Sequence, residues 1–441
     1  MQRNGDRDRG SVLAIGFSTT VCMWTVGYLG RLPFVEAPAW LLFVLMLACL
    51  AAGGIVAGRY ATWRAGLWAG TLSAALNLLI LGSLLGGGRP NQLSQSAAWW
   101  IGGSILLGTA LGGLGGAIGR SWPATKPSPS NWTATLAFVA CFAALLLIIA
   151  GGLVTSNRAG LAVVDWPNSF GYNMFLYPLA RMTGGIYYEH AHRLLGTLVG
   201  LSTLVLVIHL HIVDSRRWLR RFALAALALV ICQGILGGLR VTGRFTLSTS
   251  PAETAPSIAL AAVHGVVGQV FFGMLVALGV FCTRAWREPR AVPARTTARA
   301  ETALGAVLVV TLVAQLALGA IQRHIERGLL MHITLGVVVV LLAVACGVRA
   351  WGYYTEQPII RRTGIALLVL TALQVLLGFG ALIAVGSTSG IEQPPPLRVS
   401  VTTAHQVTGA CLLACAIMLT LWCNRLLATP PASHRLSTRP R

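Results

Sequence analysis

Twelve long apolar runs follow one another along the 441-residue chain, and short polar segments separate them. Each run holds about 20 residues, the length that an α-helix needs to cross the hydrocarbon core of a bilayer. The predicted spans are roughly 11–30, 38–58, 64–86, 99–119, 133–155, 190–212, 220–241, 257–282, 303–323, 329–350, 364–385 and 400–423. This pattern predicts an all-α polytopic membrane protein with about twelve transmembrane helices.

Composition and charge agree with a membrane protein, because 55% of the residues are hydrophobic and only 10% are charged. The net charge of +21 does not indicate a nucleic-acid partner, since the arginines lie between apolar runs and form no basic domain. With the N-terminus inside, inner segments carry 23 Arg and Lys residues and outer segments carry 10. Basic residues favour the cytoplasmic side, so both termini are expected there.

 The expected location is therefore the bacterial cytoplasmic (inner) membrane.

Cysteine usage and the first apolar run exclude two other classes. Nine cysteines are scattered, mostly inside apolar runs, with no CxxC motif, so no disulfide framework or zinc site is indicated. The run at 11–30 is long enough to be a membrane span, and it does not read as a cleavable signal.

A His-x-x-x-Gly motif occurs four times, each time near the start of a different apolar run. The four copies are His192/Gly196, His264/Gly268, His332/Gly336 and His405/Gly409. The distance is 140 residues from His192 to His332 and 141 residues from His264 to His405. Gln233 and Gln374 repeat at 141 residues as well. The period predicts a duplicated unit with two histidines per copy, the first half at about 133–282 and the second at about 303–423.

The four histidines fall on the sixth, eighth, tenth and twelfth spans, which all run from outside to inside. They are therefore expected at one level, near the outer face. Packed helices lie about 10 Å apart, so two imidazoles on facing helices can ligate both faces of one iron. One histidine per helix in apolar surroundings suits haem better than zinc. The alternative is four core histidines beside packing glycines.

Glu189 lies three residues before His192, on the same face of a helix, at the border between a polar loop and an apolar run. The second copy has Gly328 and Leu329 at the corresponding place, so the carboxylate is unique to the first copy. This asymmetry predicts that one site performs chemistry and the other holds a permanent haem. The alternative for Glu189 is an ion pair with Arg193.

Other polar residues at the same border allow two interpretations each. His190 points about 100° away from Glu189 on a helix, toward the loop or a propionate. Arg193, Arg240 and Arg244 lie on the outer side, where haem propionates would emerge, and they also suit a simple membrane boundary. The 157–188 connection is a candidate lid, although its aromatic residues are equally typical of a membrane interface.

Residues 1–125 differ from the rest of the chain. They contain four predicted spans and no histidine, and dense glycine at 112–116 favours close helix packing. They are predicted to form an accessory membrane domain or a stabilising addition, which a Pro- and Ser-rich linker at 121–131 separates from the duplicated region. Residues 426–441 are expected to form a basic cytoplasmic tail.

Two stretches of the sequence carry a family resemblance. The chain reads GGLVTSNRAGLAVVDWPNSFGYNMF at 151–175 and GGIYYEHAHRLLGTLVG at 184–200. With the histidines on the later spans, these stretches resemble haem A synthase, a family of cytochrome oxidase assembly, over roughly Thr133 to Cys423. The first outer loop lacks the cysteine pair of some members, and the four N-terminal spans lie outside the family pattern.

The resemblance implies an eight-helix, pseudo-duplicated bundle over 133–425 that oxidises a porphyrin methyl group of haem O to the formyl group of haem A. His192 and His264 would hold the substrate haem O beside the catalytic Glu189, and His332 and His405 would be the axial ligands of haem b. Expected partners are haem O, an electron donor, haem O synthase, oxidase assembly factors and membrane lipid. Competing hypotheses are a non-enzymatic di-haem b electron carrier and a transporter; clustering of polar residues at one face weakens the latter.

Overall fold

Helices dominate the computed structural model, which describes residues 4–86, 89–122, 131–242, 258–288 and 297–427. The chain forms two compact units, residues 1–260 and residues 261–441. In the first, the helices are α1 (Asn4–Gly30), α2 (Ala39–Tyr60), α3 (Trp63–Leu85), α4 (Ala97–Ser121), α5 (Trp132–Ser156), the 3-10 turn η1 (Leu179–Arg181), α6 (Gly184–Val213) and α7 (Arg217–Thr242). The others are α8 (Ile258–Cys282), α9 (Arg284–Arg287), α10 (Ala298–Ile325), α11 (Leu329–Tyr353), α12 (Pro358–Ser387) and α13 (Pro396–Leu426).

Twelve of the helices in the described residues are long and apolar enough to cross a membrane, which confirms the predicted fold class and span number. The helices extend beyond the apolar runs at several ends. α6 begins at Gly184 and not near residue 190, and α12 begins at Pro358 and not near residue 364. Charged residues such as Arg361 and Arg362 end an apolar run, yet they continue a helix without cost once they reach the interface. Hydropathy therefore underestimates helix length.

Glycine contacts hold α2, α3 and α4 together in the first unit. A Cβ added at Gly54, Gly66 or Gly70 would meet backbone atoms of α4, and one added at Gly116 would lie 2.7 Å from the Trp63 carbonyl oxygen. Small residues allow such close approach of helices in a bilayer, where packing and not hydrophobicity drives association. The close packing predicted for the 112–116 stretch is confirmed.

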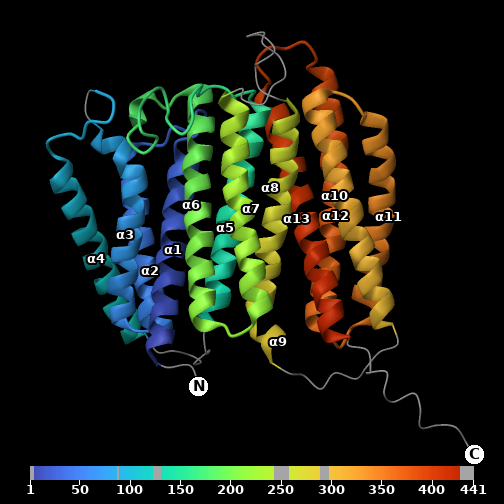
Figure 1. Ribbon diagram of the computed structural model, residues 1–441, viewed down its shortest axis with the longest axis horizontal. Coiled ribbons are helices and arrows are strands. Elements are labelled where there is room, and N and C mark those ends of the chain that lie inside the picture. Colours follow the sequence, from blue (N-terminus) through green and yellow to red (C-terminus); the bar gives the residue numbers. More distant parts are fainter. Residues whose placement is uncertain (1–3, 87–88, 123–130, 243–257, 289–296, 428–441) are drawn as a thin grey trace, which may run out of the picture. The chain divides into compact units, whose positions relative to one another are not determined.

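Helix α1 connects this glycine-packed group to the duplicated region. It packs against α2 and α3, and also against α5. Inside the unit, the Trp24 indole donates a hydrogen bond of 2.9 Å to Asn77 of α3, an interaction worth about 0.6–2 kcal/mol between membrane helices. The first 125 residues therefore share a compact unit with α5, α6 and α7 (Figure 1).

In the second unit, α10 packs against α11 and α13, and α12 packs against the same two helices. Its core contains Leu308 and Leu312 of α10, Ala343 of α11, Leu367 of α12 and Leu412 of α13. A tight turn joins α10 to α11, because Glu326 and Gly328 both adopt left-handed backbone angles with φ of 56° and 90°. This turn leaves no room for a counterpart of the long connection between α5 and α6.

Candidate functional site

The connection between α5 and α6, residues 157–183, folds onto the first turns of α6. We call it the 157–183 loop. The Asp165 carboxylate closes a turn in it by accepting hydrogen bonds from the backbone N–H groups of Phe170 and Gly171, at 2.6 and 2.8 Å. Ser169 and Tyr172 pair through backbone hydrogen bonds of 2.8 and 3.0 Å. The loop is thus an ordered element that can position side chains.

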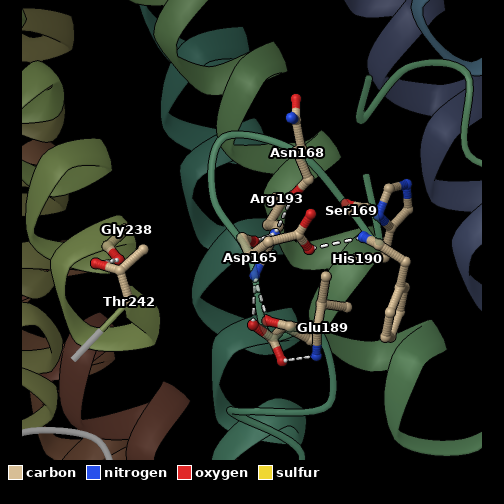
Figure 2. Close-up of polar contacts among 10 residues, drawn as sticks. Asp165, Asn168, Ser169, Glu189, His190, Arg193, Gly238 and Thr242 are labelled. Carbon is tan, nitrogen blue, oxygen red and sulfur yellow. Dashed lines mark hydrogen bonds and ion pairs between the residues drawn. The ribbon is translucent and has the colours of Figure 1, made fainter. Parts of the chain in front are cut away.

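Arg193 of α6 binds the 157–183 loop through three carbonyl oxygens. Its Nη1 donates to Asp165 at 2.7 Å and to Asn168 at 3.0 Å, and its Nη2 donates to Val163 at 2.8 Å. The same Nη2 donates to Glu189 at 2.8 Å (Figure 2). The guanidinium therefore fixes the loop and the carboxylate relative to each other.

Glu189 is 4% exposed, and both carboxylate oxygens accept hydrogen bonds. Oε1 accepts from Arg193, and Oε2 accepts from the backbone N–H of Val163 at 2.9 Å. The ion pair with Arg193, one of the two interpretations from the sequence, is present in the structure. It fixes the carboxylate at one position beside His192 and does not by itself decide between a structural and a chemical role.

His190 faces the loop, in keeping with its position one residue after Glu189. Its Nδ1 lies 3.0 Å from the Ser169 hydroxyl, and its ring lies 5.1 Å from the Tyr177 ring, centroid to centroid. Burial raises the pKa of the Tyr177 phenol, so this residue stays neutral at physiological pH. His190 is therefore a loop contact in this structure.

Helix α7 also contacts the loop. A Cβ at Gly238 would clash with the Trp166 indole, and a Cβ at Gly160 would clash with the Arg240 guanidinium. Arg240 therefore lies against the loop. Arg244, the other arginine of this group, lies outside the described residues.

His192 is seated against a glycine of the preceding helix. A Cβ at Gly151 of α5 would lie 3.0 Å from the His192 Cε1 atom. Further along α6, no described atom lies within 4 Å of a Cβ added at Gly196 or Gly200. His264, the predicted partner of His192, lies on α8 in the other unit, and the pairing stays a prediction.

The second unit repeats the glycine seat twice. A Cβ at Gly319 of α10 would lie 3.0 Å from His332 Cε1, and a Cβ at Gly378 of α12 would lie 3.1 Å from His405 Cε1. The two imidazole rings have centroids 6.4 Å apart and planes 81° apart. These glycine contacts thus position His332 of α11 and His405 of α13 close to each other.

The distance between these rings suits one iron held from both sides. Two metal–imidazole bonds of about 2 Å each, plus about 1 Å from each ring centre to its nitrogen, give roughly 6 Å between centroids. Both His332 and His405 have a buried Nδ1 atom with no hydrogen-bond partner among the described residues. The described chain contains no group of three or more His, Cys, Asp or Glu side chains that could hold a metal ion. Two histidines suffice for haem, because the porphyrin supplies the remaining ligands.

Two glutamines lie beside these histidines; the sequence pattern indicated Gln374, and Gln315 was missed. The Gln315 amide donates 2.9 Å to the His332 carbonyl oxygen, and the Gln374 amide nitrogen lies 3.4 Å from His405 Nε2. A Gln-x-x-x-Gly motif could have found both, since Gln315/Gly319 and Gln374/Gly378 share the spacing of Gln233/Gly237. Leu147 takes the place of glutamine before Gly151.

These features define a class: an integral membrane protein of twelve candidate spans, with histidines seated on glycines near the N-terminal ends of its helices. Residues 134–333, less than half of the chain, match the COX15-CtaA family model, which is described as cytochrome oxidase assembly protein. The match contains Glu189, His192, His264 and His332, while α1–α4 and His405 lie outside it. No curated protein matches the chain.

Proposed function

We propose that this protein converts haem O to haem A by oxidising one porphyrin methyl group to a formyl group. The overall change is R–CH3 + H2O + 2 A → R–CHO + 2 AH2, in which water supplies the oxygen atom. Here A is a quinone-type two-electron acceptor, so the redox partner of this step takes up electrons. The proposal depends on the environment of Glu189. This buried carboxylate accepts hydrogen bonds through both oxygens and lies three residues before His192 on α6.

In this proposal His192 and His264 hold the substrate haem O. The open side of α6 at Gly196 and Gly200 accommodates the flat substrate close to the backbone. Glu189 accepts a proton from the reacting methyl or stabilises positive charge that develops there, a role that typically contributes about 10²–10⁴-fold. Arg193 and the Val163 amide hold the carboxylate in place for that task.

His332 and His405 hold haem b, which supplies one-electron transfer when it is bound. Their glycine seats and the distance between their rings support this assignment. We place both haem sites near the outer face and both termini in the cytoplasm, on the charge bias of the sequence. A thiol-directed, membrane-impermeant reagent tests this: it should label Glu392→Cys in intact cells and leave Arg287→Cys unlabelled.

The test of the reaction is Glu189→Gln, which is nearly isosteric and removes the charge. Cells that express a haem O source with this variant should retain haem b and bind haem O, yet make no haem A or stop at the alcohol. Extracted haems are separated by chromatography. Undiminished haem A would remove Glu189 from the mechanism.

Glu301→Gln is the matched control. Glu301 is 7% exposed and pairs with Arg349 at 2.6 Å, so it also has a buried carboxylate and an arginine, in the second unit. The same substitution there removes a similar ion pair away from the proposed chemistry, and haem A production should persist. Loss of haem A in both variants would point to general destabilisation.

A non-enzymatic di-haem b electron carrier is the second candidate. The Arg193 ion pair favours it, because that pair accounts for a buried Glu189 without any chemistry. The carrier predicts that Glu189→Gln shifts a redox potential modestly and that no haem A forms in the wild type.

A further inference from the structure

Two glycines at the end of α3 form a seat for the backbone of the 157–183 loop. A Cβ at Gly82 would clash with the Phe175 carbonyl oxygen, and a Cβ at Gly86 would lie 2.8 Å from the Leu176 carbonyl oxygen. Any larger residue at Gly82 must displace the loop backbone. The accessory helices therefore touch the loop directly, at the end of the unit where α3 meets it (Figure 1).

Asn91, in the connection between α3 and α4, ties the same loop by two hydrogen bonds. Its Oδ1 accepts 2.6 Å from the Asn173 backbone N–H, and its Nδ2 donates 3.4 Å to the Gly171 carbonyl oxygen. The Asn91 backbone has a φ of 63°, a left-handed conformation that asparagine tolerates better than most residues. The connection thus presents an amide that matches a backbone N–H and C=O of the loop.

A third contact reaches the start of α6. Tyr187 stacks on Tyr28 of α1 with centroids 5.8 Å apart and planes 14° apart, and its hydroxyl donates to the Tyr28 carbonyl oxygen at 2.5 Å. Tyr187 is two residues before Glu189. Contacts from α1, α3 and the α3–α4 connection therefore converge on the segment that carries the carboxylate.

The other face of the loop holds Glu189. Val163 donates to its Oε2, and Arg193 links its Oε1 to the Asp165 and Asn168 carbonyls. We propose that the α1–α4 domain acts as a brace. It contacts the face of the 157–183 loop opposite Glu189 and fixes the loop, so that the loop holds Glu189 in its reactive position. Asn91 and Gly82 are then positioning residues. The effect on product rests on the proposed function, whereas the clamp itself does not.

Asn91→Gly tests the brace cleanly, because glycine accepts the left-handed φ while both side-chain hydrogen bonds disappear. Full-length protein in lipid nanodiscs is compared by hydrogen exchange with mass spectrometry. The loop peptides should exchange about 10-fold faster or more. Haem A yield should fall, up to about 100-fold, because small displacements of a reacting group are costly. Haem b content should not change. Asn91→Asp keeps the acceptor and should recover part of both effects.

Glu36→Gly is the matched control. Glu36 is exposed, has a φ of 40° and lies in the connection between α1 and α2, so the same substitution is made at a similar backbone conformation. Exchange in the loop and haem A yield should equal the wild type. Gly82→Val should act like Asn91→Gly by displacing the loop.

Each outcome decides the question. Unchanged loop exchange in Asn91→Gly and Gly82→Val would overturn the brace. Faster loop exchange with normal haem A yield would overturn the positioning role. If the wild type makes no haem A, the proposed reaction fails, and the exchange comparison still tests the clamp by itself.

Discussion

His192 and the His332–His405 pair share one structural feature, a glycine contact from the preceding helix, and differ in the residues around it. Each of these histidines rests on a glycine of the preceding helix. Beyond His332 and His405, the glycines four residues on are covered, since Cβ positions at Gly336 and Gly409 lie 3.2 and 3.3 Å from glutamine amides. The corresponding side of α6 is open at Gly196. In the proposed function, the covered glycines belong to the haem b site and Gly196 belongs to the substrate site.

The second difference is the loop. The first half places an ordered 157–183 loop and a fixed carboxylate beside its histidine, whereas the second half has only the tight turn at Glu326–Gly328. A duplicated scaffold can therefore hold two similar ligands and give only one of them a reactive neighbour. In the proposed function, the two halves therefore differ at the loop and its carboxylate, while the histidines and their glycines are shared.

The largest expected effect comes from removing a ligand of the closed pair. His332→Ala or His405→Ala should abolish the low-spin haem b signal, because an iron without one strong axial ligand is poorly held in an apolar pocket. Absorption spectra and extracted haem from purified protein provide the measurement. A wild-type haem b content in both variants would refute the assignment of this pair.

An intermediate effect is expected at the glycine seats. Gly319→Ala places a Cβ 3.0 Å from His332, and Gly151→Ala places one 3.0 Å from His192, so each ring must move by a few tenths of an ångström. Gly319→Ala should weaken haem b retention, and Gly151→Ala should lower haem A yield while haem b stays. If both variants change the same haem, the two halves do not have separate tasks. Gly102→Ala, with no described atom within 4 Å, is the control.

The smallest effect is expected at Gln315. Gln315→Leu gives α10 the residue that α5 has at Leu147, and it removes one hydrogen bond of 2.9 Å to the His332 carbonyl. Such bonds contribute about 0.6 kcal/mol on average between membrane helices. The variant should keep haem b and lose it at slightly lower temperature in a thermal release assay. Complete loss of haem b would give Gln315 a role in holding haem.

The sequence predicted what depends on neighbours along the chain. Apolar runs identified twelve spans, and the four-residue spacing of Glu189 and Arg193 anticipated their ion pair. Contacts between distant segments were not predictable. The seat of His332 on Gly319 depends on how α10 and α11 pack, and no spacing rule reveals it. The role of Asn91 could not be predicted from the sequence either, because its partners lie about 80 residues away in the loop.

The roles of the four histidines and of Glu189 stay predictions, and so do two features of the chain's arrangement. The pairing of His192 with His264 involves two units, and the division of the chain near residue 125 is a functional proposal. In the structure, α1 packs on α5, so the accessory helices and the start of the duplicated region share one unit. A Pro- and Ser-rich linker indicates where the chain is exposed, but it does not indicate which helices pack together.

The proposed conversion of haem O to haem A is tested most directly by identifying the haems that the purified full-length protein carries. The protein is expressed with a haem O source, and its haems are extracted, separated by chromatography and identified by mass. The account predicts haem b together with haem O or haem A, and loss of haem A, with haem b retained, in Glu189→Gln. Haem b alone in the wild type, with no haem O or haem A, would contradict it.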